Sequence, residues 1–310
     1  MNLLRMKEHA EKLHLFAQET ESRARENPED FVLQLVAKNQ RDASHEADEK
    51  YLLAVGQQSA QSLEWRLIGA RMESGSVPLG LLTKLSDSIN KLLLKAAYFS
   101  RNKEDAQRGV GDQFAQELNL KLAGLSKGSA RLFIVGNTLP DATGSAPLPE
   151  AITHVMNALG SGELATSFYD SLGDLGEQAA SALHDALKAM EQEECSVEVT
   201  WRSSGEARMQ SLRFDQIVRM RAMLEGSSGV DVIDDEVSGL VGLLASSGRI
   251  QVVESSGQKT NVRFKPKSQG QRVAQLRLGQ AVALKTRAKI YRDPLTGEET
   301  RLHRLADSSD

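Results

Sequence analysis

The sequence predicts an α+β protein with an N-terminal helical arm, a central α+β domain and a small C-terminal β-barrel. Three observations indicate this division. The first 60 residues carry apolar side chains at three- and four-residue steps, which is typical of amphipathic helices. The middle of the chain mixes such helical stripes with alternating strand patterns, and the last 80 residues consist of short strand patterns separated by turns. We therefore predict domains at 1–60, 61–226 and 230–306.

The arm is predicted to contain two helices. The apolar stripe of the first is formed by Leu3, Met6, Ala10, Leu13, Phe16 and Ala17. Asn27 and Pro28 indicate the start of the second helix, with Asn27 as the N-cap and Pro28 in the first turn. The polar run at 41–50 is either a solvated helical stretch or a hinge. The arm can pack on the central domain or pair with a second copy of the chain as a homo-oligomer.

The central domain is predicted to combine two hairpins, one further strand and a set of helices. The hairpin loops fall at 125–129 and 203–206, where Gly and Ser gather. The predicted strands are 62–69, 117–124, 130–135, 197–201 and 208–212. The predicted helices are 79–99, 149–160, 163–172, 174–193 and 214–224. This order favours an antiparallel or mixed sheet with helices packed on it.

After a Ser/Gly linker at 227–229, the C-terminal module is predicted to be a closed barrel. Its strands fall at 236–245, 249–254, 260–265, 280–291 and 299–305. Five short strands in so few residues favour closure, because a closed barrel has no free edge strands. On its strand spacing, the module resembles OB-fold and SH3-like barrels.

The charge of the chain is unevenly distributed. The whole chain has 38 basic and 42 acidic residues, a net charge of −4. Residues 249–304 hold 13 Lys/Arg and 4 Asp/Glu, a net of +9, while residues 1–248 carry a net of −11. A basic module on an acidic body predicts an anionic partner, which is either a nucleic-acid backbone or an acidic protein surface.

The strand at 280–291 carries the most regular cationic pattern. Because side chains alternate along a strand, Lys285, Arg287 and Lys289 share its outward face at roughly 6–7 Å intervals. One cation per phosphate of an extended strand is compatible with that spacing. The predicted anion-binding residues are Lys259, Arg263, Lys265, Lys267, Arg272, Arg277, Lys285, Arg287 and Lys289.

Two observations limit this prediction. The only aromatic residues in the module are Phe264 and Tyr291, so contact with a nucleic-acid backbone is favoured over base stacking. The same lysines and arginines also suit the solvated face of a barrel, or docking on an acidic surface of this chain or of a partner.

No catalytic, cofactor or metal signature stands out. The six histidines are scattered, and we expect His154 and His184 at exposed helix positions. Cys195 is the only cysteine, without a nearby basic residue, which indicates a structural thiol. The acidic cluster from Asp231 to Glu236 is interpreted as a linker or as a cap that pairs with the barrel, with a cation site as the alternative.

We expect a cytoplasmic, non-enzymatic protein without a cofactor or metal. A membrane partner is not expected, because no apolar run approaches the roughly 18 residues of a membrane span and the charged N-terminus does not fit a signal peptide. The leading hypothesis is a nucleic-acid-associated adaptor. The alternative is an assembly subunit whose arm oligomerises and whose barrel docks on an acidic protein. A third is an enzyme, which a pocket lined by titratable side chains in the central domain would support.

Overall fold

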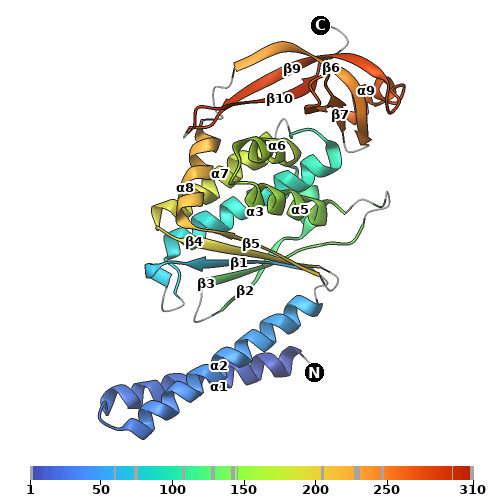
Figure 1. Ribbon diagram of the computed structural model, residues 1–310. Helices are drawn as coiled ribbons and strands as arrows, with labels where there is room; N and C mark the ends of the chain where they lie inside the picture. The colour runs from blue at the N-terminus through green and yellow to red at the C-terminus, as the bar shows by residue number, and fades with distance from the viewer. Residues whose placement is uncertain are drawn as a thin grey trace. The chain divides into compact units, whose positions relative to one another are not determined.

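The computed structural model is α+β and contains a helical arm and a closed five-stranded barrel, as predicted (Figure 1). It describes residues 3–58, 61–72, 76–106, 109–126, 130–140, 144, 146–203, 206–226, 231–245, 248–294 and 296–307. Most of the predicted hairpin loops at 125–129 and 203–206, and the linker at 227–229, lie outside these residues.

The chain forms two compact units. The first consists of Met1–Thr83, Gln116–Thr138 and Glu193–Arg213, and the second of Lys84–Ala115, Leu139–Gln192 and Phe214–Asp310. The three domain boundaries stay a prediction.

In the first unit, α1 (Leu3–Glu26) and α2 (Phe31–Gln58) form a helical hairpin (Figure 1). The seam is built from small residues: Ala10, Ala17 and Ala24 are buried at seven-residue intervals on α1, and Ala37 and Ser44 repeat the spacing on α2. Such a spacing keeps one face of each helix toward the other. The polar run at 41–50 belongs to α2 and is therefore not a hinge.

The predicted cap of the second helix is wrong. Helix α2 begins at Phe31, and the carboxylate of Asp30 accepts a hydrogen bond from the amide of Leu33 at 3.0 Å. Asn27 instead lies in a turn, where its carbonyl accepts a bond from the amide of Asp30 at 3.2 Å. Pro28 is tolerated in this turn because it has no N–H that would need a partner.

The sheet of the first unit is antiparallel, with the strand order β2-β3-β1-β4-β5. Leu63, Trp65 and Leu67 are buried on one face. On the other face, Glu64 forms ion pairs with Arg131 at 3.3 Å and Arg202 at 2.7 Å. The strands are β1 (Gln61–Ile68), β2 (Lys121–Ser126), β3 (Ala130–Val135), β4 (Ser196–Ser203) and β5 (Glu206–Leu212).

One predicted strand begins later than expected. Residues 117 and 118 belong to a helix, α4 (Asp112–Leu118), and not to the strand predicted at 117–124. Asn119 follows with a φ of 47°, a left-handed conformation that asparagine tolerates better than most residues. It ends the helix before β2 begins. A short 3-10 turn, η1 (Ala70–Met72), follows β1.

The second unit contains a layer of helices. Their bounds are α5 (Pro147–Gly160), α6 (Ala165–Leu175), α7 (Glu177–Gln192) and α8 (Phe214–Glu225), together with most of α3 (Leu79–Asn102). Each buries an apolar stripe, with Leu92, Val155, Phe168 and Leu183 almost fully enclosed.

The barrel has the closed strand order β10-β8-β7-β6-β9. Only the β8–β10 pair is parallel among its described pairs. Val241, Ile250, Val252 and Val262 fill the interior. The strands are β6 (Asp231–Ala245), β7 (Arg249–Val253), β8 (Lys259–Arg263), β9 (Ala281–Arg292) and β10 (Glu299–Leu305).

Two features of the barrel differ from the prediction. Strand β6 begins at Asp231, so the acidic cluster from Asp231 to Glu236 is part of a strand and not a linker. A short helix, α9 (Pro266–Val273), connects β8 to β9 and was not predicted. Pro266 at its first position was the available signal, but the polar composition of the helix lacks the apolar stripe that marks longer helices.

Candidate anion-binding surface of the barrel

Strand β9 alternates as a strand period requires. Leu284, Thr286 and Ala288 are buried, while Lys285 and Arg287 are exposed. Lys289 points outward as well, but its side chain is only 29% exposed. The cations of this strand therefore face two different environments.

Arg263 is held by the helical layer. Its Nη2 donates to the Asp170 carboxylate at 3.0 Å and to the Asp170 carbonyl, and its Nη1 donates to the Asp174 carboxylate. The side chain is only 15% exposed. We call Asp170, Gly173 and Asp174 of α6 the Arg263 socket. A Cβ atom at Gly173 would overlap the Arg263 guanidinium, which accounts for a glycine inside this helix.

The socket also holds the strand next to β8. Arg249 lies opposite Arg263 in the β7–β8 ladder and forms an ion pair with Asp174. Asn261 donates from Nδ2 to the Asp170 carboxylate at 3.3 Å. Because two acids one helical turn apart face two arginines on adjacent strands, the outer face of β7 and β8 is engaged by α6.

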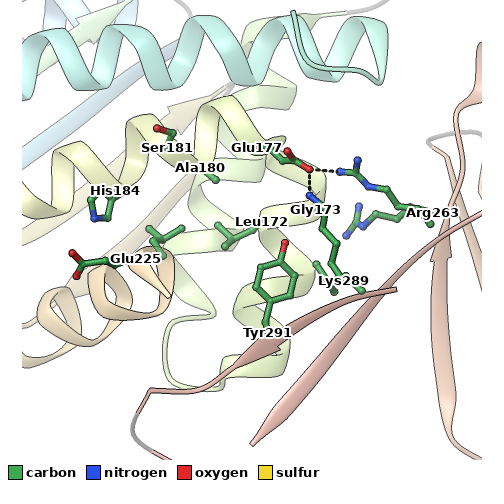
Figure 2. Close-up of a pocket in the computed structure, with 13 residues that line it drawn as sticks. Leu172, Gly173, Glu177, Ala180, Ser181, His184, Glu225, Arg263, Lys289 and Tyr291 are labelled. Carbon is green, nitrogen blue, oxygen red and sulfur yellow. Dashed lines mark hydrogen bonds and ion pairs between the residues drawn. The ribbon is translucent and has the colours of Figure 1, made fainter. Parts of the chain in front are cut away.

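A second ionic contact joins β9 and β10 to α7. Glu177 forms an ion pair with Lys289 (Figure 2). It forms a second one with Arg304, at 3.4 Å. Partial burial acts to raise the pKa of Glu177, but the hydrogen bond and charge of Lys289, together with the charge of Arg304, outweigh burial and lower this pKa. Glu177 is therefore a carboxylate at neutral pH.

A pocket of about 450 Å³ lies next to this contact (Figure 2). Its walls come from α6, α7 and α8 on one side and from strands of the barrel on the other. Tyr291 lines it and stacks on Tyr169 with ring centroids 4.5 Å apart. Burial raises the pKa of both phenols, that of Tyr169 to about 12, so both are neutral at physiological pH.

Five of the predicted cations gather around α9 and the neighbouring end of β9. We call this group the α9 edge; it consists of Lys265, Lys267, Arg272, Arg277 and Lys285, all of them exposed. Two side-chain contacts of the α9 edge are long. Lys265 lies 4.0 Å from Asp307, and Arg272 donates to the Ala306 carbonyl at 3.4 Å. Lys267 donates to the Asn102 side chain at 3.2 Å.

The other predicted cations are arranged differently. Arg263 and Lys289 face acids of the helical layer. Arg287 lies 3.8 Å from Asp234, its neighbour on β6. Within the α9 edge, Lys285 has Glu236 opposite it on β6. Exposed Lys259 begins β8. The predicted residues therefore do not form one continuous surface.

The acids of α6 and α7 were not recognised from the sequence. Asp170 and Asp174 are four residues apart, a spacing that places both on one side of α6. Glu177 follows the break at Gly176 and begins α7. This pattern was available, but it does not reveal which cations face it.

Other candidates change with the structure. His154 and His184 are partly buried, not exposed as predicted. Burial lowers the pKa of His154 and keeps its imidazole neutral. Cys195 is buried, and desolvation raises its pKa to about 11. Within the described ranges, no cluster of His, Cys, Asp and Glu is arranged to hold a metal ion. None of the helices among those ranges is long and apolar enough to cross a membrane.

Comparison of the chain with models of known protein families, with curated proteins and with solved structures finds no match.

Proposed function

We propose that the protein is a non-enzymatic nucleic-acid-associated adaptor that contacts phosphates through the α9 edge. The observation that carries the proposal is the composition of this part of the barrel. Residues 255–292 contain ten Lys/Arg and no Asp or Glu. Five of these cations are exposed at the α9 edge, whereas Arg263 and Lys289 face acids of α6 and α7. Exposed cations of this kind bind a polyanion by displacing its condensed counterions.

The topology of the barrel supports the proposal. We assign it to the OB class rather than the SH3-like class, because β10 is inserted between β8 and β9 and a helix connects the third strand to the fourth. OB barrels bind oligonucleotides on the face of their second and third strands. Here those strands are β7 and β8, whose arginines are engaged by the Arg263 socket. We therefore place the phosphate contacts at the α9 edge instead.

The experiment is a fluorescence-anisotropy titration with labelled 20-nucleotide single-stranded DNA, single-stranded RNA and duplex DNA. About five phosphate contacts predict a duplex affinity that falls about 500-fold between about 50 and 200 mM salt. The variant Arg272→Glu/Arg277→Glu/Lys285→Glu leaves two phosphate contacts, so its duplex affinity should fall only about tenfold over the same salt range.

The matched control changes three exposed cations of the arm, in Arg5→Glu/Lys12→Glu/Lys38→Glu. It alters the net charge by the same amount and is expected to keep the wild-type salt dependence. If both triple variants weaken binding equally, the α9 edge is not the contact surface. If the wild-type protein binds none of the three probes at low salt, the nucleic-acid function itself is wrong.

A second candidate function, an assembly subunit, is favoured by apolar residues on the arm. Phe31 is 77% and Val32 68% exposed, and Leu35 and Val36 are exposed beside them at the start of α2. Together they present apolar surface on the order of 400 Å², which is the size of the largest apolar patch on a typical monomer, and such patches are often functional. The proposed occupant is a second copy of the arm. If the protein is an assembly subunit, the barrel docks on an acidic surface of a partner protein, as its arginines do on the acids of α6.

Light scattering coupled to gel filtration tests this candidate. The wild-type protein is expected at a multiple of its 33.9 kDa chain mass, and Phe31→Ser/Leu35→Ser at the mass of one chain. The control, Leu164→Ser/Leu278→Ser, removes two exposed leucines elsewhere and should leave the mass unchanged. A wild-type protein of single-chain mass at micromolar concentration rules out self-assembly through the arm.

A further inference from the structure

We infer that the pocket between α6, α7, α8 and the barrel binds a small amphipathic anion, with a carboxylate or phosphate head and an apolar body. This site is separate from the α9 edge and does not depend on nucleic-acid binding. The inference rests on the charge at one end of the pocket, on its apolar walls and on the acid at its other end.

The barrel end of the pocket carries more positive than negative charge. Glu177 forms ion pairs with both Lys289 and Arg304. Asp170 and Asp174 are already matched by two arginines of β7 and β8. One positive charge therefore remains within this group, whose members are Arg249, Arg263, Lys289, Arg304, Asp170, Asp174 and Glu177. A single anion would neutralise it.

Arg304 is the residue best placed to receive the anionic head. Its side chain is 44% exposed, and its contact with Glu177 is 3.4 Å long. A guanidinium has five N–H donors, so one contact with a carboxylate leaves donors available. Arg263, by contrast, uses both terminal nitrogens in its socket. The head therefore binds at Arg304 and Lys289.

The middle of the pocket is apolar. Leu172, Ala180 and Leu224 line it from the helices, and Leu302 lines it from the barrel. Tyr291 reaches into the same space (Figure 2). The volume of about 450 Å³ lies within the range of small-molecule sites. Each methylene group that enters such a space raises affinity about fourfold.

The other end of the pocket sets the direction of the ligand. His184 and Glu225 lie at the end opposite Lys289 and Arg263 (Figure 2). The Glu225 carboxylate repels an anion, so the head binds at the barrel end while the apolar body extends along the leucines. A neutral compound of the same length lacks the attraction at the barrel end and binds more weakly.

The test is calorimetric titration of the full chain with octanoate, octyl phosphate and 1-octanol. We expect dissociation constants on the order of 0.1–1 mM for the better anion, because the probes are small. The neutral alcohol should bind about two- to fivefold more weakly. The two anions distinguish a carboxylate ligand from a phosphate ligand. Equal binding of the alcohol and both anions would overturn the assignment of an anionic head.

Two substitutions should move the affinity in opposite directions. Glu177→Gln adds a second unmatched positive charge and is expected to tighten anion binding about two- to fivefold. Arg304→Gln removes the surplus charge and is expected to weaken it by a similar factor. Lys285→Gln changes a lysine of β9, the strand of Lys289, but outside the pocket lining, and should have no effect. Shifts in the same direction for Glu177→Gln and Arg304→Gln would contradict the inference.

A steric variant keeps the test decisive if a charge variant fails to fold. Ala180→Leu narrows the pocket from the α7 side without changing its charge. It should abolish binding of both anions while the thermal unfolding midpoint stays close to that of the wild type. Unchanged anion binding by a folded Ala180→Leu protein would show that the ligand does not occupy this pocket.

Discussion

Replacing Gly173 with alanine is expected to destabilise the protein, although the same change inside a helix normally stabilises it. Glycine costs about 1 kcal/mol relative to alanine in a helix interior, so helix propensity alone favours the substitution. At Gly173, however, the new methyl group would overlap the Arg263 guanidinium. Arg263 must then move away from the acids of its socket.

The magnitude follows from the contacts that this movement breaks. Arg263 donates three hydrogen bonds, two of them to carboxylates, and is only 15% exposed. Hydrogen bonds to charged groups contribute about 1.5–3 kcal/mol each. Losing one or two of them costs about 2–4 kcal/mol, since the flexible side chain keeps some contact. After the gain of about 1 kcal/mol in helix propensity, we expect a net loss of about 1–3 kcal/mol.

The assay is urea unfolding followed by circular dichroism, with a matched substitution as the control. Gly270 lies inside α9, where a Cβ atom would meet nothing within 4 Å. Gly270→Ala should therefore stabilise the protein by up to about 1 kcal/mol. The double variant Gly173→Ala/Arg263→Met should lose less stability than the two single changes added together, because the overlap is gone. If Gly173→Ala and Gly270→Ala both stabilise, the Arg263 socket does not constrain α6.

Three further predictions concern single residues. Because the pKa of Glu177 is lowered in the folded state, its carboxylate stabilises the protein at pH values above the ordinary pKa of 4.5, and this contribution disappears as the pH falls below that value. The thermal unfolding midpoints of wild type and Glu177→Gln should therefore differ at pH 7 and converge in acid. A difference that stays constant with pH would refute the ion pair. Cys195 is buried with a pKa of about 11, so a thiol reagent at pH 8 should react with it only after denaturant is added, whereas rapid labelling of the native protein would show an accessible thiolate. In thermal unfolding, Asp30→Ala should destabilise the hairpin of α1 and α2 by about 1 kcal/mol, and Asn27→Ala should destabilise it by less. A larger loss of stability for Asn27→Ala than for Asp30→Ala would show that Asn27 caps α2.

Much of the fold was predictable because periodic patterns are local. The alternation along this strand depends only on strand geometry, and from Val282 to Ala288 the residues of β9 are buried and exposed in the expected order. Helix α9 was missed because eight mostly polar residues carry no apolar stripe. The cap at Asp30 was misplaced because Asn27 and Asp30 are both good capping residues, and the turn between them decides which one acts.

The candidate site was predictable only in part. The concentration of Lys and Arg after residue 248 is a property of composition, and it was enough to predict an anionic partner. Composition also put Arg263, Lys265, Lys285, Arg287 and Lys289 into one group, since every outward cation of a strand looks equivalent in the sequence. The structure separates them by what each side chain faces.

That separation is a tertiary property. Arg263 and Lys289 meet acids that lie about 90 to 110 residues away along the chain, on α6 and α7. Local periodicity places a cation on the outside of a strand, but it cannot say whether solvent or a helix lies there. Most of the secondary structure, the barrel closure and the charge asymmetry therefore followed from local pattern alone. The division of the cations between the Arg263 socket, the pocket and the exposed α9 edge depended on how the barrel packs on the helices, because ion pairing is determined by distance in space.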